Sequence, residues 1–326
     1  MTNAIVVEDL HKHFGSVVAV DGVDLAVPRG TVLGLLGPNG AGKTTIVRIL
    51  TTILRPDRGR ALILDLDVAT QPAAVRSVIG LAGQFAAVDE NLTGRENLRM
   101  VGQLTHIRKD TILPRAADLL DRFGLTDAAD RPVRTYSGGM RRRLDLAAAL
   151  VHRPPVLFLD EPTTGLDPAS RIDLWSVIAE LVADGTTLLL TTQYLEESDR
   201  LADRIVVIDG GRIVAEGSAT ELKNRIGGTV VEVRLADHAT ARSALAVVGK
   251  VGPAEIAADG ASVGVSVPDN GPAVVAVVRS LDQAGFEVRE VAVRQPTLDD
   301  VFLQLTGHAA STDGAQPAPS FAGGVR

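Results

Sequence analysis

Gly37-Pro-Asn-Gly-Ala-Gly-Lys-Thr44 matches the pattern G-x-x-x-x-G-K-Ser/Thr. It follows the apolar run Val32-Leu-Gly-Leu-Leu36 and precedes a helical run through Ile46, Ile49 and Leu50. In this context the loop amides and the helix N-terminus converge on one anion, and the glycines let the backbone approach phosphates closely. The pattern therefore predicts a phosphate-binding loop between a buried strand and a helix.

Two side chains of this loop have the chemistry to bind a nucleotide with its cation. Lys43 would reach the β- and γ-phosphates, and the Thr44 hydroxyl would ligate Mg²⁺. The alternative is a glycine-rich turn with an incidental lysine. Because lysine is scarce in this chain, a chance match is expected roughly once in a few hundred chains, and the strand–loop–helix context makes it rarer.

A second apolar run, Val156-Leu-Phe-Leu-Asp160, ends in a pair of carboxylates with Glu161. Asp160 is placed to hold the Mg²⁺ shell, and Glu161 to polarise an attacking water. An apolar strand that ends in Asp-Glu is, on its own, more often a structural strand end. Downstream of a phosphate-binding loop, the catalytic interpretation is favoured.

A third candidate for anion binding is Tyr136-Ser-Gly-Gly-Met140, which precedes an Ala/Leu-rich helical run. Ser137, Gly138 and Gly139 would present a hydroxyl, free amides and the positive end of a helix dipole. The alternative is a simple N-cap with a glycine turn, and the position just before the Asp160 strand favours the anion site. Because the chain is acidic, Arg141-Arg-Arg143 is interpreted as a solvated helix face with partner salt bridges, and the alternative is a nucleic-acid-binding patch.

The arrangement of apolar runs predicts the fold class. From Ile5 to about Gly217, short Val/Ile/Leu-rich runs alternate with helical patterns, which is typical of a parallel sheet buried on both faces. Thr93-Gly-Arg-Glu96 fits a helix capping box. After residue 228 the order becomes β-α-β-β-α-β, with a hairpin across residues 258–261, and this order is that of a ferredoxin-like unit. Thr297-Leu-Asp-Asp300 caps a last short helix.

These patterns predict an α/β protein with three parts. Residues 1–225 form a nucleotide-binding domain of the P-loop NTPase class. Residues 228–306 form a small α+β accessory domain of ferredoxin-like type. Residues 307–326 are rich in Ala, Gly, Pro and Ser and are expected to be a disordered tail.

Composition excludes several classes of function. The 326 residues carry a net charge of −7 and only 3% aromatic side chains, so binding to nucleic acid is not expected. There are no cysteines, which excludes disulfides and thiolate metal sites. No apolar run approaches the roughly 18–20 residues that span a bilayer. The N-terminal residues do not form a secretory signal, so a cytosolic chain is expected.

From about residue 5 to 220 the sequence resembles the ATP-binding-cassette (ABC) ATPases. The resemblance identifies Ser137-Gly-Gly as the signature motif, Gln84 as the glutamine-loop residue, Gly165-Leu-Asp167 as the loop after the Asp-Glu strand, and Phe14 as the aromatic residue against adenine. The implied ATP-binding residues are Phe14, Gly37, Pro38, Asn39, Gly40, Ala41, Gly42, Lys43, Thr44, Thr45, Gln84, Ser137, Gly138, Gly139, Asp160 and Asp167. The implied Mg²⁺ ligands are Thr44, Gln84 and Asp160.

The implied catalytic residues are Glu161, Gln193 and Lys43, and Gln193 is a departure from the family. The family normally has a histidine at this position, at the end of a strand. Glutamine can donate a hydrogen bond to the γ-phosphate but cannot carry a positive charge, so we expect reduced hydrolysis rather than none. Tyr136 and Met140 replace the usual Leu and Gln of the signature, which leaves the Ser-Gly-Gly contact intact.

Gln193 also narrows the resemblance. Its segment Thr191-Thr-Gln-Tyr-Leu-Glu-Glu197 is similar to the daunorubicin/doxorubicin-resistance ATP-binding subunits. Three further segments share this similarity, and they cover residues 135–143, 83–94 and 296–307. This resemblance extends over nearly the whole chain.

The resemblance implies an ATP-hydrolysing subunit at the cytoplasmic face of the cell membrane. It would power export of drugs, antibiotics or lipids through a separate membrane permease, with residues Ala86, Ala87 and Val88 near the docking surface. In the family, the signature of one cassette closes on the nucleotide of another, so a homodimer or a heterodimer is implied. The alternatives are a nucleotide-sensing regulatory or self-resistance binding protein, and a cassette ATPase not linked to transport.

Overall fold

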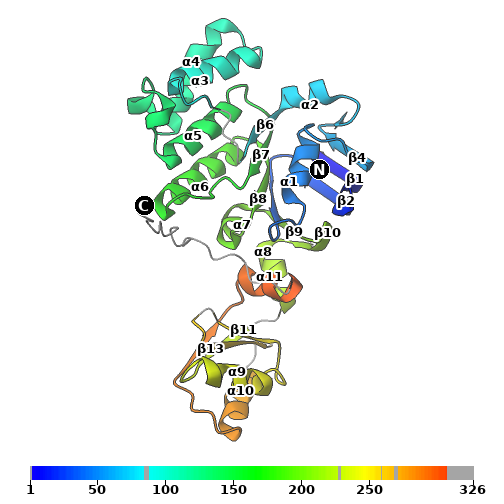
Figure 1. The fold of residues 1–326 in the computed structure, drawn as a ribbon, viewed down its shortest axis with the longest axis vertical. Coiled ribbons are helices and arrows are strands. Elements are labelled where there is room, and N and C mark those ends of the chain that lie inside the picture. The colour runs from blue at the N-terminus through cyan, green and yellow to red at the C-terminus, as the bar shows by residue number, and fades with distance from the viewer. Residues whose placement is uncertain (1, 84–87, 227–228, 258, 268–270, 307–326) are drawn as a thin grey trace, which may run out of the picture.

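The computed structural model describes residues 2–83, 88–226, 229–257, 259–267 and 271–306. The expected tail at 307–326 lies outside the described residues. Residues up to about 226, blue to green in Figure 1, form a larger body, and most of the later residues, yellow to orange, form a smaller one. Among the described residues, each helix is too short or too polar to span a bilayer.

A six-stranded sheet forms the centre of the larger body. Its strands are β3 (Val32–Leu36), β6 (Ile79–Ala82), β7 (Val156–Asp160), β8 (Thr187–Thr192), β9 (Arg204–Asp209) and β10 (Arg212–Gly217). Their order is β10-β9-β3-β8-β7-β6, and all neighbours are parallel except β10 and β9. Every residue of β3, β7 and β8 is buried, which confirms that these apolar runs are strands covered on both faces.

A four-stranded antiparallel sheet packs on one side of this centre. Its strands are β1 (Asn3–Phe14), β2 (Val17–Pro28), β4 (Arg58–Ile63) and β5 (Leu66–Asp67), in the order β2-β1-β4-β5. Helices α1 (Lys43–Leu50) and α2 (Pro72–Val78) lie with it. One hydrophobic core joins this sheet, α1 and the central sheet, and it includes Ile5, Ile46 and Phe158.

Helices cover the other side of the central sheet and extend beyond it. They are α3 (Gly94–Leu104), α4 (Lys109–Arg122), α5 (Gly138–Ala149) and α6 (Pro168–Ala183), with the 3₁₀ turns η1 (Thr126–Ala128) and η2 (Val133–Thr135). A second core joins them and includes Leu98, Leu119 and Leu159. The predicted capping box at the start of α3 is confirmed, because Thr93 Oγ1 accepts from Glu96 N at 3.1 Å and Glu96 Oε2 accepts from Thr93 N at 2.8 Å.

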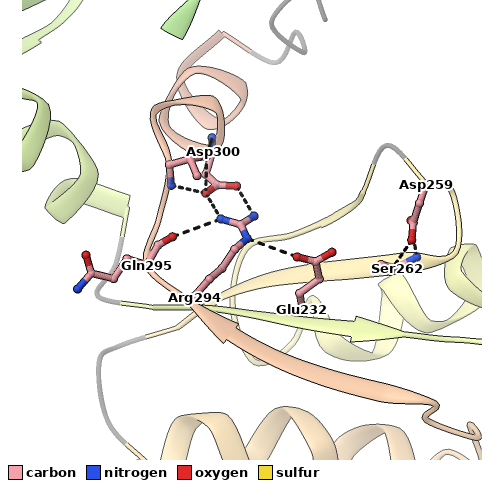
Figure 2. Close-up of polar contacts among 7 residues, drawn as sticks. Glu232, Asp259, Ser262, Arg294, Gln295 and Asp300 are labelled. Carbon is pink, nitrogen blue, oxygen red and sulfur yellow. Dashed lines mark hydrogen bonds and ion pairs between the residues drawn. The ribbon is translucent and has the colours of Figure 1, made fainter. Parts of the chain in front are cut away.

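The smaller body has the predicted β-α-β-β-α-β order. Its elements are β11 (Thr229–Arg234), α9 (His238–Val248), β12 (Ala254–Ile256), β13 (Ser262–Val267), α10 (Gly271–Gln283) and β14 (Glu290–Arg294). The strand order β12-β13-β11-β14, antiparallel throughout, is that of a ferredoxin-like unit. Between β12 and β13, Ala258 lies outside the described residues. The Asp259 carboxylate accepts hydrogen bonds from Ser262 (Figure 2) and from the Ala261 N–H.

The last helix, α11 (Leu298–Thr306), returns to the larger body. It packs on α7 (Leu195–Leu201) and α8 (Ala219–Ile226) (Figure 1). Its residues Leu298, Val301 and Phe302 share one hydrophobic core with Leu36, the residue just before the phosphate-binding loop, and with Leu195. The predicted cap is confirmed, since Thr297 N donates to Asp300 Oδ2 at 2.6 Å and Asp300 N donates to Thr297 Oγ1 at 3.3 Å.

An acidic cluster around one arginine joins α11 to the C-terminal sheet (Figure 2). Arg294 of β14 pairs with both carboxylate oxygens of Asp300, at 2.6 and 2.9 Å, and with Glu232 of β11 at 3.4 Å. Glu255 faces the same cluster. Burial, and then the negative charge of Asp300, raise the pKa of Glu255 to about 6.

Glu255→Gln is expected to raise the free energy of unfolding at pH 7.5 by about 1 kcal/mol, the full linkage energy having been reduced for partial exposure. The folded-state pKa of about 6 lies above the ordinary value of 4.5, so the folded protein binds this proton more tightly. That stabilisation is complete below pH 4.5 and is lost as the pH rises through 6, whereas glutamine stays neutral. Chemical unfolding at pH 7.5 and at pH 4.5 tests this, and an equal gain at both would contradict the titration.

Candidate nucleotide site

The phosphate-binding loop connects β3 to α1, as the sequence predicts. Two glycines allow its close packing. A Cβ on Gly37 would lie 2.3 Å from the carbonyl oxygen of Ile208, and a Cβ on Gly42 would lie 2.4 Å from that of Ala19. Gly42 also has φ +109°, which side chains other than glycine rarely adopt. Both positions therefore require glycine for the loop to close over the helix N-terminus.

Lys43 is buried at the first position of α1. Its Nζ donates to the carbonyl oxygens of Gly37 at 2.7 Å and Pro38 at 3.0 Å, so the ammonium group lies within the curve of the loop. Burial lowers the pKa of Lys43, while the negative charges of Glu161 and Asp160 act in the opposite direction. The ammonium group of Lys43 thus faces Asp160 and Glu161, the two carboxylates that the sequence predicts to act at the same site.

Thr44 and Asp160 meet at the end of β7. The Thr44 Oγ1 donates to Asp160 Oδ1 at 3.3 Å, and Thr191 Oγ1 of β8 donates to the same oxygen at 2.5 Å. One hydroxyl and one carboxylate are the hard oxygen donors that Mg²⁺ prefers when phosphates supply the remaining ligands. No group of three or more His, Cys, Asp or Glu side chains within the described residues could hold a metal alone. This donor set fits Mg²⁺ bound together with a phosphate.

Glu161 is buried and its backbone is strained. It has φ +50°, an uncommon conformation for a residue other than glycine. Its N–H lies 3.0 Å from the Thr191 carbonyl oxygen and 3.1 Å from Thr191 Oγ1, and its Oε2 accepts from Thr164 Oγ1 at 3.3 Å. These bonds hold the strained turn, which directs a carboxylate toward the loop that carries Lys43. Strain of this kind is typical of functional sites.

The Ser137-Gly-Gly segment forms the N-terminus of α5. Ser137 is the N-cap, and its Oγ accepts from Met140 N at 3.2 Å. A Cβ on Gly138 would meet no atom within 4 Å, so the space before this helix end is open. Gly138 and Glu161 line one hollow of about 250 Å³, together with Gly83 and Gly165. Lys43 is not among the residues that line it.

The other predicted residues occupy several places. Pro38, Asn39, Gly40 and Ala41 lie in the loop, and Thr45 follows in α1. Asp167 caps α6, where hydrogen bonds from Ser170 lower the pKa of its carboxyl. Gln193 follows β8 directly and is half-buried. Gln84, Ala86 and Ala87 lie outside the described residues.

Phe14 ends β1, at the hairpin that leads into β2. Its side chain is 47% exposed, and Lys12 Nζ lies 5.6 Å from the centre of its ring. Ala19 of the same hairpin contacts the phosphate-binding loop at Gly42. Phe14 thus presents an exposed aromatic ring on the hairpin that contacts this loop, and such a ring is available to stack on a base.

Tyr136 and Met140, the two departures in the signature segment, have structural roles. The Tyr136 hydroxyl is buried and donates to the Ala128 carbonyl oxygen at 2.7 Å. Gly94 provides the space, because a Cβ there would lie 2.5 Å from this hydroxyl. Met140 packs against the same helical core. Both residues therefore support the helices without altering the open end of α5.

Arg142 is a residue that the sequence did not single out. The interpretation of Arg141-Arg-Arg143 as a solvated face is wrong for it, because its guanidinium points inward from α5. It donates to the carbonyl oxygens of Pro162 at 2.6 Å, Glu161 at 2.9 Å and Asp160 at 3.2 Å, and also to that of Gly83. A buried ion pair with Asp145, at 3.5 Å, completes its contacts. One side chain thus connects the helix that begins at Ser137 to the turn that carries Glu161.

Comparisons with known sequences find ABC transporter ATP-binding proteins along nearly the whole length of the chain. The profile of the ABC transporter family matches residues 20–164, and that of the ATP-binding protein DrrA1-3-like C-terminal domain matches residues 217–306. The daunorubicin resistance ATP-binding protein DrrA2 of Streptomyces coeruleorubidus is 54% identical, over 97% of this chain and 98% of its own length. The Nod factor export ATP-binding protein I of Ralstonia nicotianae is 39% identical, over 94% of both chains.

Solved structures resemble the larger body. A nucleotide-free ATP-binding cassette from an ABC transporter is 28% identical with a TM-score of 0.62, over 68% of this chain and 94% of its own. The ADP conformation of another such cassette is 27% identical with a TM-score of 0.61, over 68% and 93%. These structures have the fold that the sequence predicts for the phosphate-binding domain.

Proposed function

The chain belongs to the ABC transporter family, among the daunorubicin-resistance ATP-binding proteins, and from this premise we propose that it is the ATP-hydrolysing subunit of an exporter. The observation that carries the proposal is the meeting of Lys43 and Thr44, at the start of α1, with Asp160 and Glu161, at the end of β7. A cation for the phosphates, oxygen ligands for a metal and a buried carboxylate are the parts that hydrolysis of a phosphoanhydride requires.

Each residue of the nucleotide site has a separate role in ATP hydrolysis. Loop amides and Lys43 bind and neutralise the phosphates, while the Thr44 hydroxyl and the Asp160 carboxylate hold Mg²⁺. When bound, the metal ion withdraws charge from the phosphate oxygens. Glu161 accepts the proton of the attacking water, and its strained turn keeps the carboxylate in place before substrate arrives. Phe14 stacks on the adenine.

Gln193 orients the γ-phosphate as a neutral donor. Neutral hydrogen bonds contribute about half of what charge-assisted ones contribute, a difference near 1 kcal/mol. Turnover is therefore expected to be several-fold slower than in a cassette with histidine at this position. Gln84 is proposed as a third Mg²⁺ ligand on the basis of its sequence segment.

A second cassette completes the site. Gly138, at the open N-terminal end of α5, lines a hollow that Lys43 does not line, which supports the use of the Ser137-Gly-Gly segment toward the nucleotide of another chain. The cassettes pair as a homodimer or a heterodimer. They act at the cytoplasmic face of the membrane on a separate permease, and their closure on ATP and reopening after hydrolysis drive it between two states. Drugs, antibiotics or lipids are the proposed cargo, because relatives are named for daunorubicin resistance and Nod factor export.

The β-α-β-β-α-β unit favours a second candidate, a nucleotide-sensing regulatory or self-resistance binding protein, because such units bind ligands in other proteins. Reconstitution in vesicles with the partner permease distinguishes the two. For an exporter subunit, we expect the permease to stimulate ATP hydrolysis several-fold and daunorubicin, as probe, to accumulate only with ATP. Tight ATP binding without hydrolysis in the presence of the permease would favour the sensor.

A further inference from the structure

Strand β14 lies at the edge of the C-terminal sheet and pairs with β11 alone among the described strands. Four of its five residues are exposed, and they include Val291 at 41% and Val293 at 56%. An exposed edge strand with apolar side chains is a template for pairing with another strand. Natural sheets usually protect such an edge with lysine, proline or a covering element.

The two valines continue a buried apolar face. Val291 lies opposite Val233 and Val293 lies opposite Val231 on β11, and both residues of β11 are fully buried beneath α9 and α10. Residues directly opposite each other in a sheet share a face. The same apolar face therefore extends past its helical cover onto β14.

The backbone of β14 offers its free groups at these valines. The Leu235 N–H donates to Ala261 O at 2.9 Å, so the odd-numbered residues of β11 face β13 and the even-numbered ones face β14. The β14 residues opposite those even positions are Glu290, Ala292 and Arg294, so their backbone N–H and C=O groups point toward β11. The N–H and C=O groups of Val291 and Val293 consequently point away from β11, toward the open edge of the sheet.

We propose that two copies of this chain pair antiparallel through β14, about a two-fold axis at Ala292. In this register Val291 of each copy lies opposite Val293 of the other, and their outward backbone groups exchange hydrogen bonds. Glu290 lies opposite Arg294 of the second copy. Displaced registers leave these charges unpaired or place like charges opposite each other, which is unfavourable. The two four-stranded sheets become one continuous sheet.

The sequence of β14 is complementary to itself in antiparallel pairing. For this reason we propose β14 of a second copy, rather than another protein, as its pairing partner. An interface between identical surfaces requires that residue i meets residue j and that j meets i, and the order Glu-Val-Ala-Val-Arg meets this condition in antiparallel pairing. Two cassettes held on one permease would bring the strands together at high effective concentration. The pairing needs no ATP hydrolysis, so it can fail while the proposed function stands.

Cysteine crosslinking of the full chain tests the pairing, because the natural sequence has no cysteine. In Ala292→Cys the two residues face each other across the axis as a non-hydrogen-bonded pair, about 4.5 Å apart at Cα, within the range for a disulfide. We expect most chains to form a disulfide dimer under mild oxidation without ATP. Glu290→Cys is the matched control on the same strand, since its two copies would be about 14 Å apart, and we expect about tenfold less dimer.

A further variant tests the strand edge itself. Val291→Lys with Val293→Lys, added to Ala292→Cys, places like charges along the edge at positions already exposed in the single chain. We expect the dimer to fall about tenfold while circular dichroism stays unchanged. Equal crosslinking of Ala292→Cys and Glu290→Cys, no effect of the lysines, persistent monomer, or crosslinking to the permease in place of a second copy would each overturn the proposal.

Discussion

Glu161→Gln is expected to bind ATP with wild-type affinity and to hydrolyse it about a thousandfold more slowly, because positioned general bases contribute about 10²–10⁴-fold. Glutamine has nearly the same shape, so the hydrogen bond with Thr164 and the turn at φ +50° are retained. It cannot accept a proton at neutral pH. Because ATP then persists, closed cassette pairs should accumulate. Single-turnover hydrolysis, equilibrium ATP binding and size-exclusion chromatography measure the three effects.

Glu180→Gln provides the control for this prediction. Glu180 lies on α6, is exposed, and pairs only loosely with Arg122 at 3.4 Å. Its replacement removes one carboxylate from the chain without touching the site, so turnover should stay at the wild-type value. Wild-type turnover in Glu161→Gln would remove Glu161 from the role of base, whereas loss of ATP binding would show that its charge supports the loop around Lys43.

Arg142→Ala is expected to lower kcat by about 30-fold and to change KM for ATP by less than about threefold. In the proposed site the nucleotide phosphates meet Lys43 and the loop, whereas the contacts of Arg142 are with Gly83, Asp145 and the backbone of residues 160–162, so affinity should persist. The backbone of Asp160, Glu161 and Pro162 loses its common donor, so the carboxylate is held less firmly. Breaking the buried pair with Asp145 should also lower the free energy of unfolding by about 3 kcal/mol.

Arg142→Lys separates positioning from stability. Lysine keeps the charge beside Asp145 but cannot present a planar fork of donors to several carbonyl oxygens. We therefore expect its free energy of unfolding to recover more than its kcat, with assays run well below the Tm of each variant. Arg143→Ala is the matched control, because that neighbouring arginine donates to Phe123 O at 3.3 Å, away from β7. An equal fall in kcat for Arg143→Ala, or full recovery of kcat in Arg142→Lys, would contradict a positioning role.

The sequence predicted the parts of the site that depend on local pattern. The strand before Gly37, the loop and the start of α1 follow from spacing, and the carboxylates after β7 follow from an apolar run with a polar end. The ferredoxin-like order was equally readable, because period-two runs alternate there with helical ones. Parallel strands place their C-terminal ends at one edge, so the meeting of Thr44 with Asp160 could be anticipated.

Contacts between distant segments could not be read in this way. The direction of Arg142 is set by the turn after β7, and nothing in Arg141-Arg-Arg143 distinguishes an inward arginine from a solvated one. Strand β14 shows only the period-two alternation that is typical of strands in general. This alternation does not indicate whether a strand lies at the edge of a sheet or which element covers it. Tyr136 was identified only as a departure, and its buried hydroxyl explains why a tyrosine is accepted there.

The position of α11 has a consequence for dissecting the chain. Leu298, Val301 and Phe302 lie in a core that also contains Leu36 and Leu195, so the last helix packs on the cassette and the accessory sheet lies between two segments of the chain that contact the cassette. Removing everything after β10 would open a cavity behind the phosphate-binding loop rather than release an independent module. The small sheet is accordingly attached to the ATPase at both of its ends. A movement of Leu195, two residues after Gln193, would be transmitted to this sheet through α11.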